Sequence, residues 1–174
     1  MIDDSYKDQK KDRKSDQELS NIIKIWKTII EVQKHFNDIA IRLRSIAITL
    51  FTFFIAAMGF SVKEGVYIII CNLSIPLGTF IGLLGIIPIW GFYFMDRHWY
   101  HRFLKAAVKK GEEIEKNNIT YFPEINLADA IKKESPYKFL GRYELHSDGK
   151  LILFYALLAI FLSIASIGLY FAKF

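Results

Sequence analysis

The chain has little of what most enzymes and disulfide-bonded domains need. Its 174 residues include one cysteine, which excludes an internal disulfide and any Cys-X-X-Cys metal or redox centre. It has no Gly-X-Ser-X-Gly, no His-Glu-X-X-His and no Walker phosphate loop. We therefore expect neither enzymatic activity nor a cofactor.

Charge is absent from three long stretches, although charged residues make up 24% of the chain. Such segregation is typical of membrane proteins. We expect spans at 45–61, at about 77–95 and at 151–171. Residues 66–76 are also mostly apolar but contain Asn72, Ser74 and Pro76, so they are interpreted as re-entrant, interfacial or loop.

Lys and Arg are concentrated in two regions outside these spans. Residues 1–44 carry ten, and residues 96–150 carry eleven, of the 23 in the chain. The positive-inside rule then places both regions in the cytoplasm and the C-terminus outside. We therefore expect a multi-pass membrane protein. Because no charge lies within a span, a proton- or sodium-coupled transporter is disfavoured.

The polar first residues, 1–17, predict a disordered cytoplasmic tail. From residue 18 to residue 58 there is no Gly or Pro, so one helix can continue from the cytoplasm into the first span. It carries a heptad stripe that consists of Ile22, Trp26, Ile29, Gln33, Phe36, Ala40 and Leu43. The stripe packs either on the protein's own cytoplasmic region or against neighbouring subunits.

The expected fold is an all-α membrane protein with three transmembrane helices. A long cytoplasmic helix precedes the first span, so that residues 18–95 form one segment that includes the outer loop and the second span. A cytoplasmic helical region, residues 96–150, separates the second span from the third, and residues 151–174 contain the third span.

The stretch DRHWYHRFLKAAVKKGEE, residues 96–113, directly follows the second span. His98, Arg102, Lys105 and Lys109 recur at helical spacing and form a basic stripe. It either anchors the helix at anionic lipid or binds an anionic ligand. His98 and His101 form an HxxH pair without a third ligand, so no metal is expected. The candidate ligand-binding residues are Arg97, His98, His101, Arg102, Lys105 and Lys109, with Lys138, Arg142 and Tyr143 as additional candidates.

Small and hydroxyl residues mark the spans for helix packing or a pore. Gly78, Gly82 and Gly85 share one face of the second span, and GTFIG is a GxxxG match. Thr49 and Thr52 place hydroxyl groups in the interior of the first span. Close packing, within or between subunits, is one interpretation, and a pore lined by hydroxyls and glycines is the other.

The order FNDIAIRLRSIAITLFTFFIAAMG, second span, then DRHWYHRFLKAAVKKGEEIE resembles the SLATT family of bacterial membrane effectors over about residues 20–118. The resemblance implies a homo-oligomeric effector of an anti-phage or other conflict system. A nucleotide or oligonucleotide signal from a partner synthase would control it, and opening would disrupt the inner membrane. The third span and residues 119–150 depart from the simplest two-span pattern of that family.

Two functional hypotheses follow. The first is the pore- or channel-forming effector just described. The second is a non-conducting structural or adaptor membrane protein, similar to the RipA type, whose basic stripe contacts anionic lipid.

Overall fold

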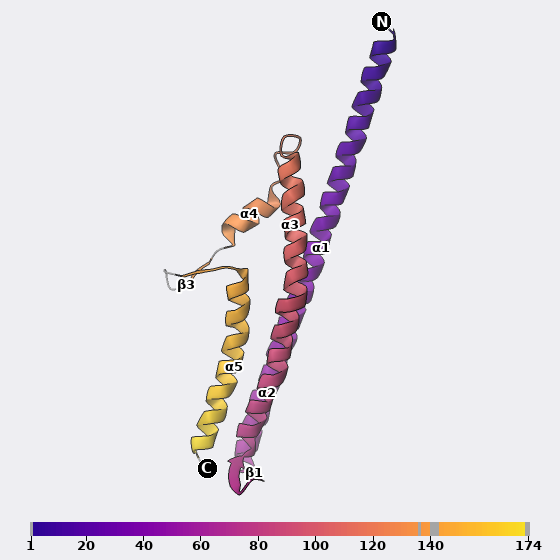
Figure 1. The fold of residues 1–174 in the computed structure, drawn as a ribbon. Helices are drawn as coiled ribbons and strands as arrows, with labels where there is room; N and C mark the ends of the chain where they lie inside the picture. The colour runs from indigo at the N-terminus through magenta and orange to yellow at the C-terminus, as the bar shows by residue number, and fades with distance from the viewer. Residues whose placement is uncertain (1, 136, 140–142, 173–174) are drawn as a thin grey trace. The chain divides into compact units, whose positions relative to one another are not determined.

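A computed structural model describes residues 2–135, 137–139 and 143–172, with side chains described for 15–69, 71–135 and 146–172. The chain is mostly helical (Figure 1). In the described residues, three helical stretches are long and apolar enough to cross a membrane: Ser15–Lys63, Leu77–Asn118 and Ser147–Ala172. The prediction of three spans is confirmed to this extent. The side of the membrane on which each end lies stays a prediction.

The helices are α1 (Ile2–Lys63), α2 (Leu77–Met95), the π-helix η1 (Asp96–Tyr100), α3 (His101–Asn118), α4 (Leu127–Glu134) and α5 (Ser147–Ala172). The predicted continuity of the first helix into the first span is confirmed, because α1 has no break. Its assignment begins at Ile2 rather than near residue 18. The side chains of residues 1–14 lie outside the described residues. The disordered tail expected at 1–17 therefore stays a prediction.

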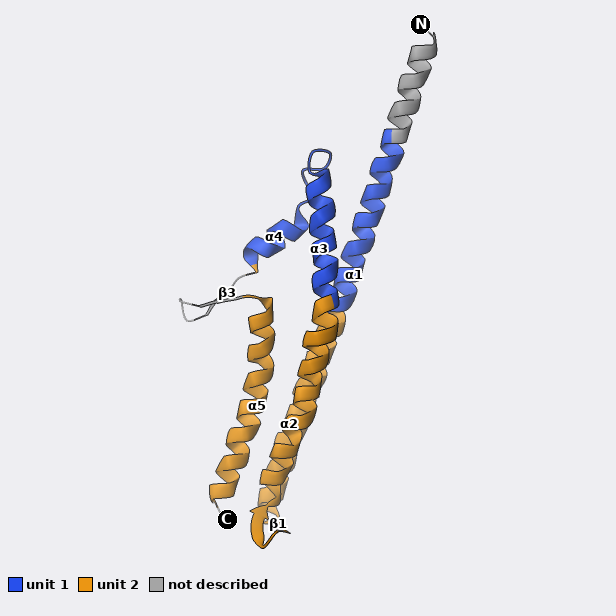
Figure 2. Ribbon diagram, in the orientation of Figure 1, with its two compact units in different colours: residues 1–37, 103–134 blue, residues 38–102, 135–174 orange. Residues whose placement is uncertain are grey.

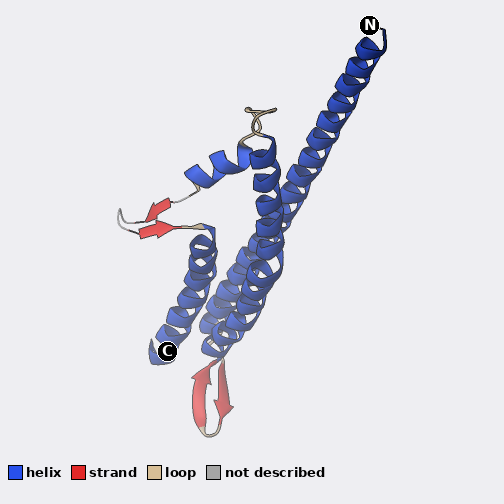
Figure 3. Ribbon diagram, turned by 45° about the horizontal axis from the view of Figure 1, so that its top comes forward, coloured by secondary structure: helices blue, strands red, loops and turns tan. Residues whose placement is uncertain are grey.

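The chain is mostly helical, as expected, and two short antiparallel hairpins connect its helices (Figure 3). The first pairs β1 (Tyr67–Ile70) with β2 (Leu73–Pro76), and the second pairs β3 (Tyr137–Phe139) with β4 (Tyr143–Leu145). In the first hairpin, isoleucines favour a strand. Its turn residues Cys71 and Asn72 have φ of 49° and 64°, as a two-residue type I′ hairpin turn requires. Residues 66–76 thus form this hairpin rather than a re-entrant helix.

The chain divides into two compact units (Figure 2). Unit 1 comprises Met1–Asn37 and Phe103–Glu134, and unit 2 comprises Asp38–Arg102 and Ser135–Phe174. α1 contributes to both units because it pairs with helices that come later in the chain. Each unit therefore contains part of α1.

In unit 1, the predicted heptad stripe packs against α3. Gln33 Nε2 donates a hydrogen bond to the Ala107 carbonyl at 3.2 Å, and the Phe36 and Phe103 ring centroids are 5.5 Å apart. Residue numbers rise along α1 as they fall along α3, so the two helices are antiparallel. Four stripe residues contact α3: Trp26, Ile29, Gln33 and Phe36. The stripe thus packs within the chain, which was one of its two predicted uses.

In unit 2, α1, α2 and α5 share one core. Its buried side chains are Ala47, Met58, Ile89, Leu151, Tyr155 and Leu162. Around it, the outward residues of the same helices are large and apolar, for example Phe53, Trp90 and Ile164, which are each more than 60% exposed. In a helix that crosses a membrane these side chains meet lipid, so their exposure is the expected outcome.

Candidate functional site

A buried carboxylate joins the three long helical segments of unit 2. Asp96, at the start of η1, is 0% exposed. Arg44 Nε of α1 donates a hydrogen bond to its Oδ2 at 2.8 Å, and the Tyr155 hydroxyl of α5 donates to the same oxygen at 3.3 Å. We call Arg44, Asp96 and Tyr155 the polar junction. A buried carboxylate costs several kcal/mol unless it is paired and hydrogen-bonded, and the junction supplies both.

The π-helical turn η1 allows Asp96 and His101 to be buried together. The His101 backbone N–H donates to the Asp96 carbonyl, which is an i to i+5 bond and inserts one extra residue into the turn. In an α-helix, residues five apart point in very different directions. Here Asp96 and His101 are both buried, at 0% and 4% exposure. Turns of this kind occur frequently at functional sites.

Two predicted ligand-binding residues, His101 and Arg97, have side-chain partners within unit 2. His101 Nε2 lies 2.7 Å from Asp148 Oδ1 in the first turn of α5. Arg97 donates a hydrogen bond to the Tyr93 hydroxyl, and its guanidinium carbon lies 5.7 Å from the centre of that ring. His101 is therefore buried against α5, whereas Arg97 is half-buried beside Tyr93.

The basic stripe is exposed along its length. His98, Arg102, Lys105 and Lys109 are all exposed, and the His98 ring packs on Phe94 at 4.9 Å between centroids. His98 and Arg102 belong to unit 2, whereas Lys105 and Lys109 belong to unit 1. Of the additional candidates, Arg142 lies outside the described residues. Lys138 and Tyr143 lie in β3 and β4, where side chains are not described.

The glycine face of α2 lies against α1 and α5 of the same chain. A Cβ on Gly85 would be 2.7 Å from the Phe54 ring, and one on Gly82 would be 2.8 Å from Met58 Sδ and would overlap Ser166 Oγ. A Cβ on Gly78 would be 2.9 Å from Leu169 Cδ1. The glycines therefore permit close approach of three helices within unit 2.

The two threonines of the first span do not belong to this packing. Thr49 and Thr52 are exposed, and each hydroxyl donates back to a carbonyl four residues earlier in α1. A hydroxyl bonded to its own helix in this way needs no partner in the surrounding lipid. Both side chains would line a pore only between copies of the chain.

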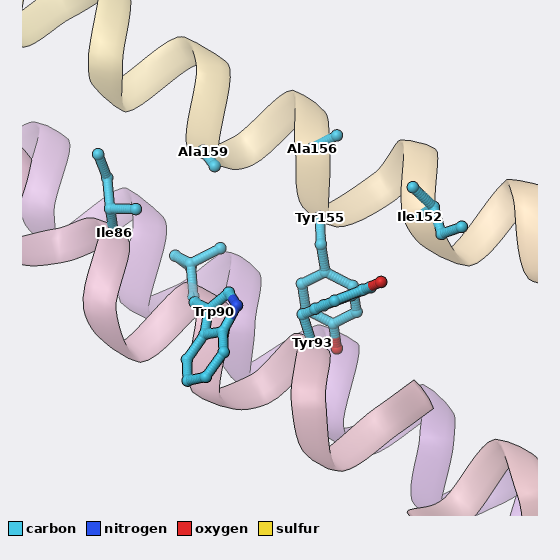
Figure 4. A pocket seen from close by; sticks show the side chains of 8 residues that line it. Ile86, Trp90, Tyr93, Ile152, Tyr155, Ala156 and Ala159 are labelled. Atoms are coloured by element: carbon cyan, nitrogen blue, oxygen red, sulfur yellow. The ribbon is translucent and has the colours of Figure 1, made fainter. Parts of the chain in front are cut away.

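A cavity of about 180 Å³ opens between α2 and α5 in unit 2 (Figure 4). Its eight lining residues are Ile86, Ile89, Trp90, Tyr93, Ile152, Tyr155, Ala156 and Ala159. Trp90 is 64% exposed and Ile152 is 39% exposed, so the cavity opens to the side of the helices. Tyr93 and Tyr155 bring the only hydroxyls of this lining.

Sequence reasoning missed the polar junction. Arg44 was counted only among the Lys and Arg residues of 1–44, and no partner was expected for Asp96. The available signal was that an arginine directly precedes the first span and an aspartate directly follows the second. Two antiparallel spans place such residues at the same depth, where opposite charges can pair.

The comparisons with known proteins leave the family open. No family model, no curated protein and no solved structure matches the chain. The resemblance to SLATT effectors therefore stays a prediction.

Proposed function

We propose that this chain is a subunit of an oligomeric, pore-forming membrane effector of a bacterial conflict system. A nucleotide or oligonucleotide signal from a partner synthase controls it, and the open pore disrupts the inner membrane. The observation that supports the proposal is the exposed basic stripe, which follows a membrane helix directly and begins two residues after the buried Asp96. Exposed Arg and Lys side chains at regular spacing suit phosphate recognition.

The π-helical turn offers a route from ligand to membrane helices. His98 lies inside η1, and Arg102 lies one residue after the His101 N–H that closes the turn. A ligand that binds both favours one geometry of this turn. Conversion of η1 to a regular α-helix would rotate Asp96 and His101 relative to each other. It would withdraw one of them from its buried position and change how α1, α2 and α5 are joined.

The same proposal includes the orientation. Residues 1–44 and 96–150 lie in the cytoplasm, where a synthase releases its product, because 21 of the 23 Lys and Arg residues lie there. The first hairpin and the C-terminus lie outside.

A second candidate is a non-conducting structural or adaptor membrane protein whose basic stripe contacts anionic lipid. One observation favours it. The heptad stripe in unit 1 and the glycine face in unit 2 both pack within the chain. The sequence left open that both features pack between subunits. Because both are used within one chain, they no longer argue for self-assembly.

Binding of the purified, detergent-solubilised chain to cyclic nucleotides and short DNA or RNA oligomers separates the two candidates. We expect selective binding that falls at least about 1,000-fold in the triple variant Arg102→Ala, Lys105→Ala, Lys109→Ala, because each lost charge-assisted hydrogen bond contributes at least about 1.5 kcal/mol. The control variant Lys24→Ala, Lys27→Ala, Lys34→Ala removes the same charge from exposed positions of α1 and should bind normally.

Equal losses in the two triple variants, or weak salt-sensitive binding of every anion, would contradict the signal site. The second candidate predicts that outcome, together with a changed preference for anionic lipid in the stripe variant.

A further inference from the structure

The side-opening cavity of unit 2 changes in polarity from one end to the other. One end is formed by Ile86 on α2 and Ala159 on α5, and the other by Tyr93, Ile152 and Tyr155 (Figure 4). On both helices the second end is the one nearer to charged residues, since Arg97 follows Tyr93 by one turn and Lys150 precedes Ile152. The cavity is therefore apolar at one end and has the Tyr93 and Tyr155 side chains at the other. The Arg97 guanidinium donates to the Tyr93 hydroxyl, and the Tyr155 hydroxyl donates to Asp96.

We propose that this cavity binds one acyl chain of an anionic glycerophospholipid whose phosphate is held by Arg97. The proposal goes beyond the proposed function and does not depend on it. It assigns a lipid site to the membrane helices, separate from the exposed basic stripe.

The apolar lining and the length of the cavity region favour an acyl chain as the occupant. Ile86, Ile89, Ala156 and Ala159 offer no hydrogen-bonding side chain, so water has too few partners there to fill the space. The opening beside the exposed Trp90 faces the surroundings of a membrane helix, and those surroundings are hydrocarbon. From Ile86 to Arg97 the helix rises about 16 Å at ~1.5 Å per residue. This is roughly half of the ~30 Å hydrocarbon core, which is the depth of one leaflet.

Arg97 favours an anionic headgroup. Its guanidinium is half-buried and is held in place by the hydroxyl and the ring of Tyr93. Tyr93 itself lines the cavity. A guanidinium has five N–H donors in a fixed fork that suits a phosphate, and the bond to Tyr93 uses one of them. An arginine positioned over an interfacial tyrosine, at the end of a lipid-accessible cavity, matches a phosphodiester at the headgroup level.

Trp90 is a built-in reporter of this site. The full chain with Trp26→Phe and Trp99→Phe keeps Trp90 as its one tryptophan, since the sequence has three. The protein is reconstituted in phosphatidylcholine vesicles that contain either brominated phosphatidylglycerol or brominated phosphatidylcholine at the same mole fraction. We expect phosphatidylglycerol to quench Trp90 with a relative binding constant about fivefold higher, the gain expected from one arginine near an anionic headgroup.

Two pairs of variants separate a site from general attraction. Arg97→Gln should abolish the preference for phosphatidylglycerol, whereas Arg102→Gln, which removes the same charge from the exposed stripe, should keep it. Ala159→Phe fills the cavity and should lower quenching by phosphatidylglycerol. Ile164→Phe, at a 65% exposed position of α5 outside this cavity, should not. Circular dichroism and the elution volume of each variant verify that it is folded.

Three outcomes would overturn the proposal. Equal quenching by the two lipids means that no headgroup is selected. Equal effects of Arg97→Gln and Arg102→Gln mean attraction to the whole basic surface. Absence of quenching by either lipid means that another copy of the chain, and not lipid, covers the cavity.

Discussion

Unit 1 and unit 2 both pair a part of α1 with a later antiparallel helix, but different chemistry holds each pair. In unit 2, glycines of α2 allow close apolar packing, and the buried polar groups converge on Asp96. In unit 1, Glu115 is 4% exposed and accepts hydrogen bonds from Trp26 Nε1 and from the Ala128 backbone N–H. The same helix, α1, is thus suited to lipid along one part and to water along the other.

The two units differ in how much free energy is lost when a buried polar group loses its partner. In unit 1, water can reach a polar group that loses its partner. In unit 2, Asp96 is fully buried between helices, and a charge left unpaired there cannot be solvated. Substitutions of the polar junction should therefore have larger effects than equivalent substitutions in unit 1.

The largest effect is expected at Asp96. Asp96→Ala leaves Arg44 and Tyr155 without their shared acceptor, and the free energy of unfolding of unit 2 should fall by about 3–5 kcal/mol. Unfolding in mixed detergent micelles measures this loss. The double variant Arg44→Met, Asp96→Leu removes both charges and should lose less than Asp96→Ala alone; a larger loss in the double variant would contradict the ion-pair explanation.

Gly82 should have the next largest effect. Gly82→Ala places a Cβ against Ser166 and Met58 and should destabilise unit 2 by about 1–3 kcal/mol through overpacking. Gly91→Ala is the matched control in α2, because its added Cβ would meet no atom of a neighbouring helix within 4 Å. The same unfolding experiment should give Gly91→Ala unchanged or slightly raised stability. Similar losses for the two variants would show that α2 does not pack through this face.

Glu115 tests unit 1 on the same scale. Glu115→Ala leaves the Trp26 indole and the first turn of α4 without their acceptor, which should cost about 1–3 kcal/mol. Faster amide hydrogen exchange in α4, with unchanged exchange in α5, is the expected result. Glu113→Ala removes an exposed carboxylate that pairs with Lys110 and should leave exchange in α4 as it is. Exchange that rises equally in α5 would show that the units do not open separately.

The smallest effect is expected from the surface pair on α4. The hydrogen bond from Lys133, 2.7 Å from Asp129 Oδ2, lowers the pKa of Asp129 below its ordinary value. A lowered pKa stabilises α4 only above the ordinary pKa of aspartate, and this contribution disappears as the pH falls through the folded-state value. Asp129→Asn should therefore remove a weak dependence of α4 helicity on pH below about 4, which NMR titration can follow. A dependence that persists in this variant would assign it to another group.

Much of the helical layout could be predicted from the sequence, because it is encoded locally. The second span expected at about 77–95 agrees with α2. The heptad stripe correctly marked the face of α1 that packs. The junction was not predictable in this way, since Arg44 and Asp96 are 52 residues apart and pair only once the register of two helices is fixed.

Two other features escaped prediction for physical reasons. The π-helical turn leaves no periodic signal, because one inserted residue changes the phase of the apolar pattern by a single step. The hairpin at 67–76 was hidden because a short apolar run with isoleucines suits a buried helix as well as a strand. The left-handed conformation at Cys71 is rare for a residue with a side chain, so only the neighbouring Asn72 signalled a turn.

Conductance across planar bilayers that contain the purified chain tests the central claim most directly. It is recorded before and after addition of the nucleotide or oligonucleotide that binds best. Our account predicts ion currents that this ligand switches on or off in the parent protein, and currents of unchanged size but without ligand control in the Arg102→Ala, Lys105→Ala, Lys109→Ala variant. Bilayers that stay silent under both conditions, with the protein shown to be inserted, would contradict a pore and leave the non-conducting membrane protein as the function.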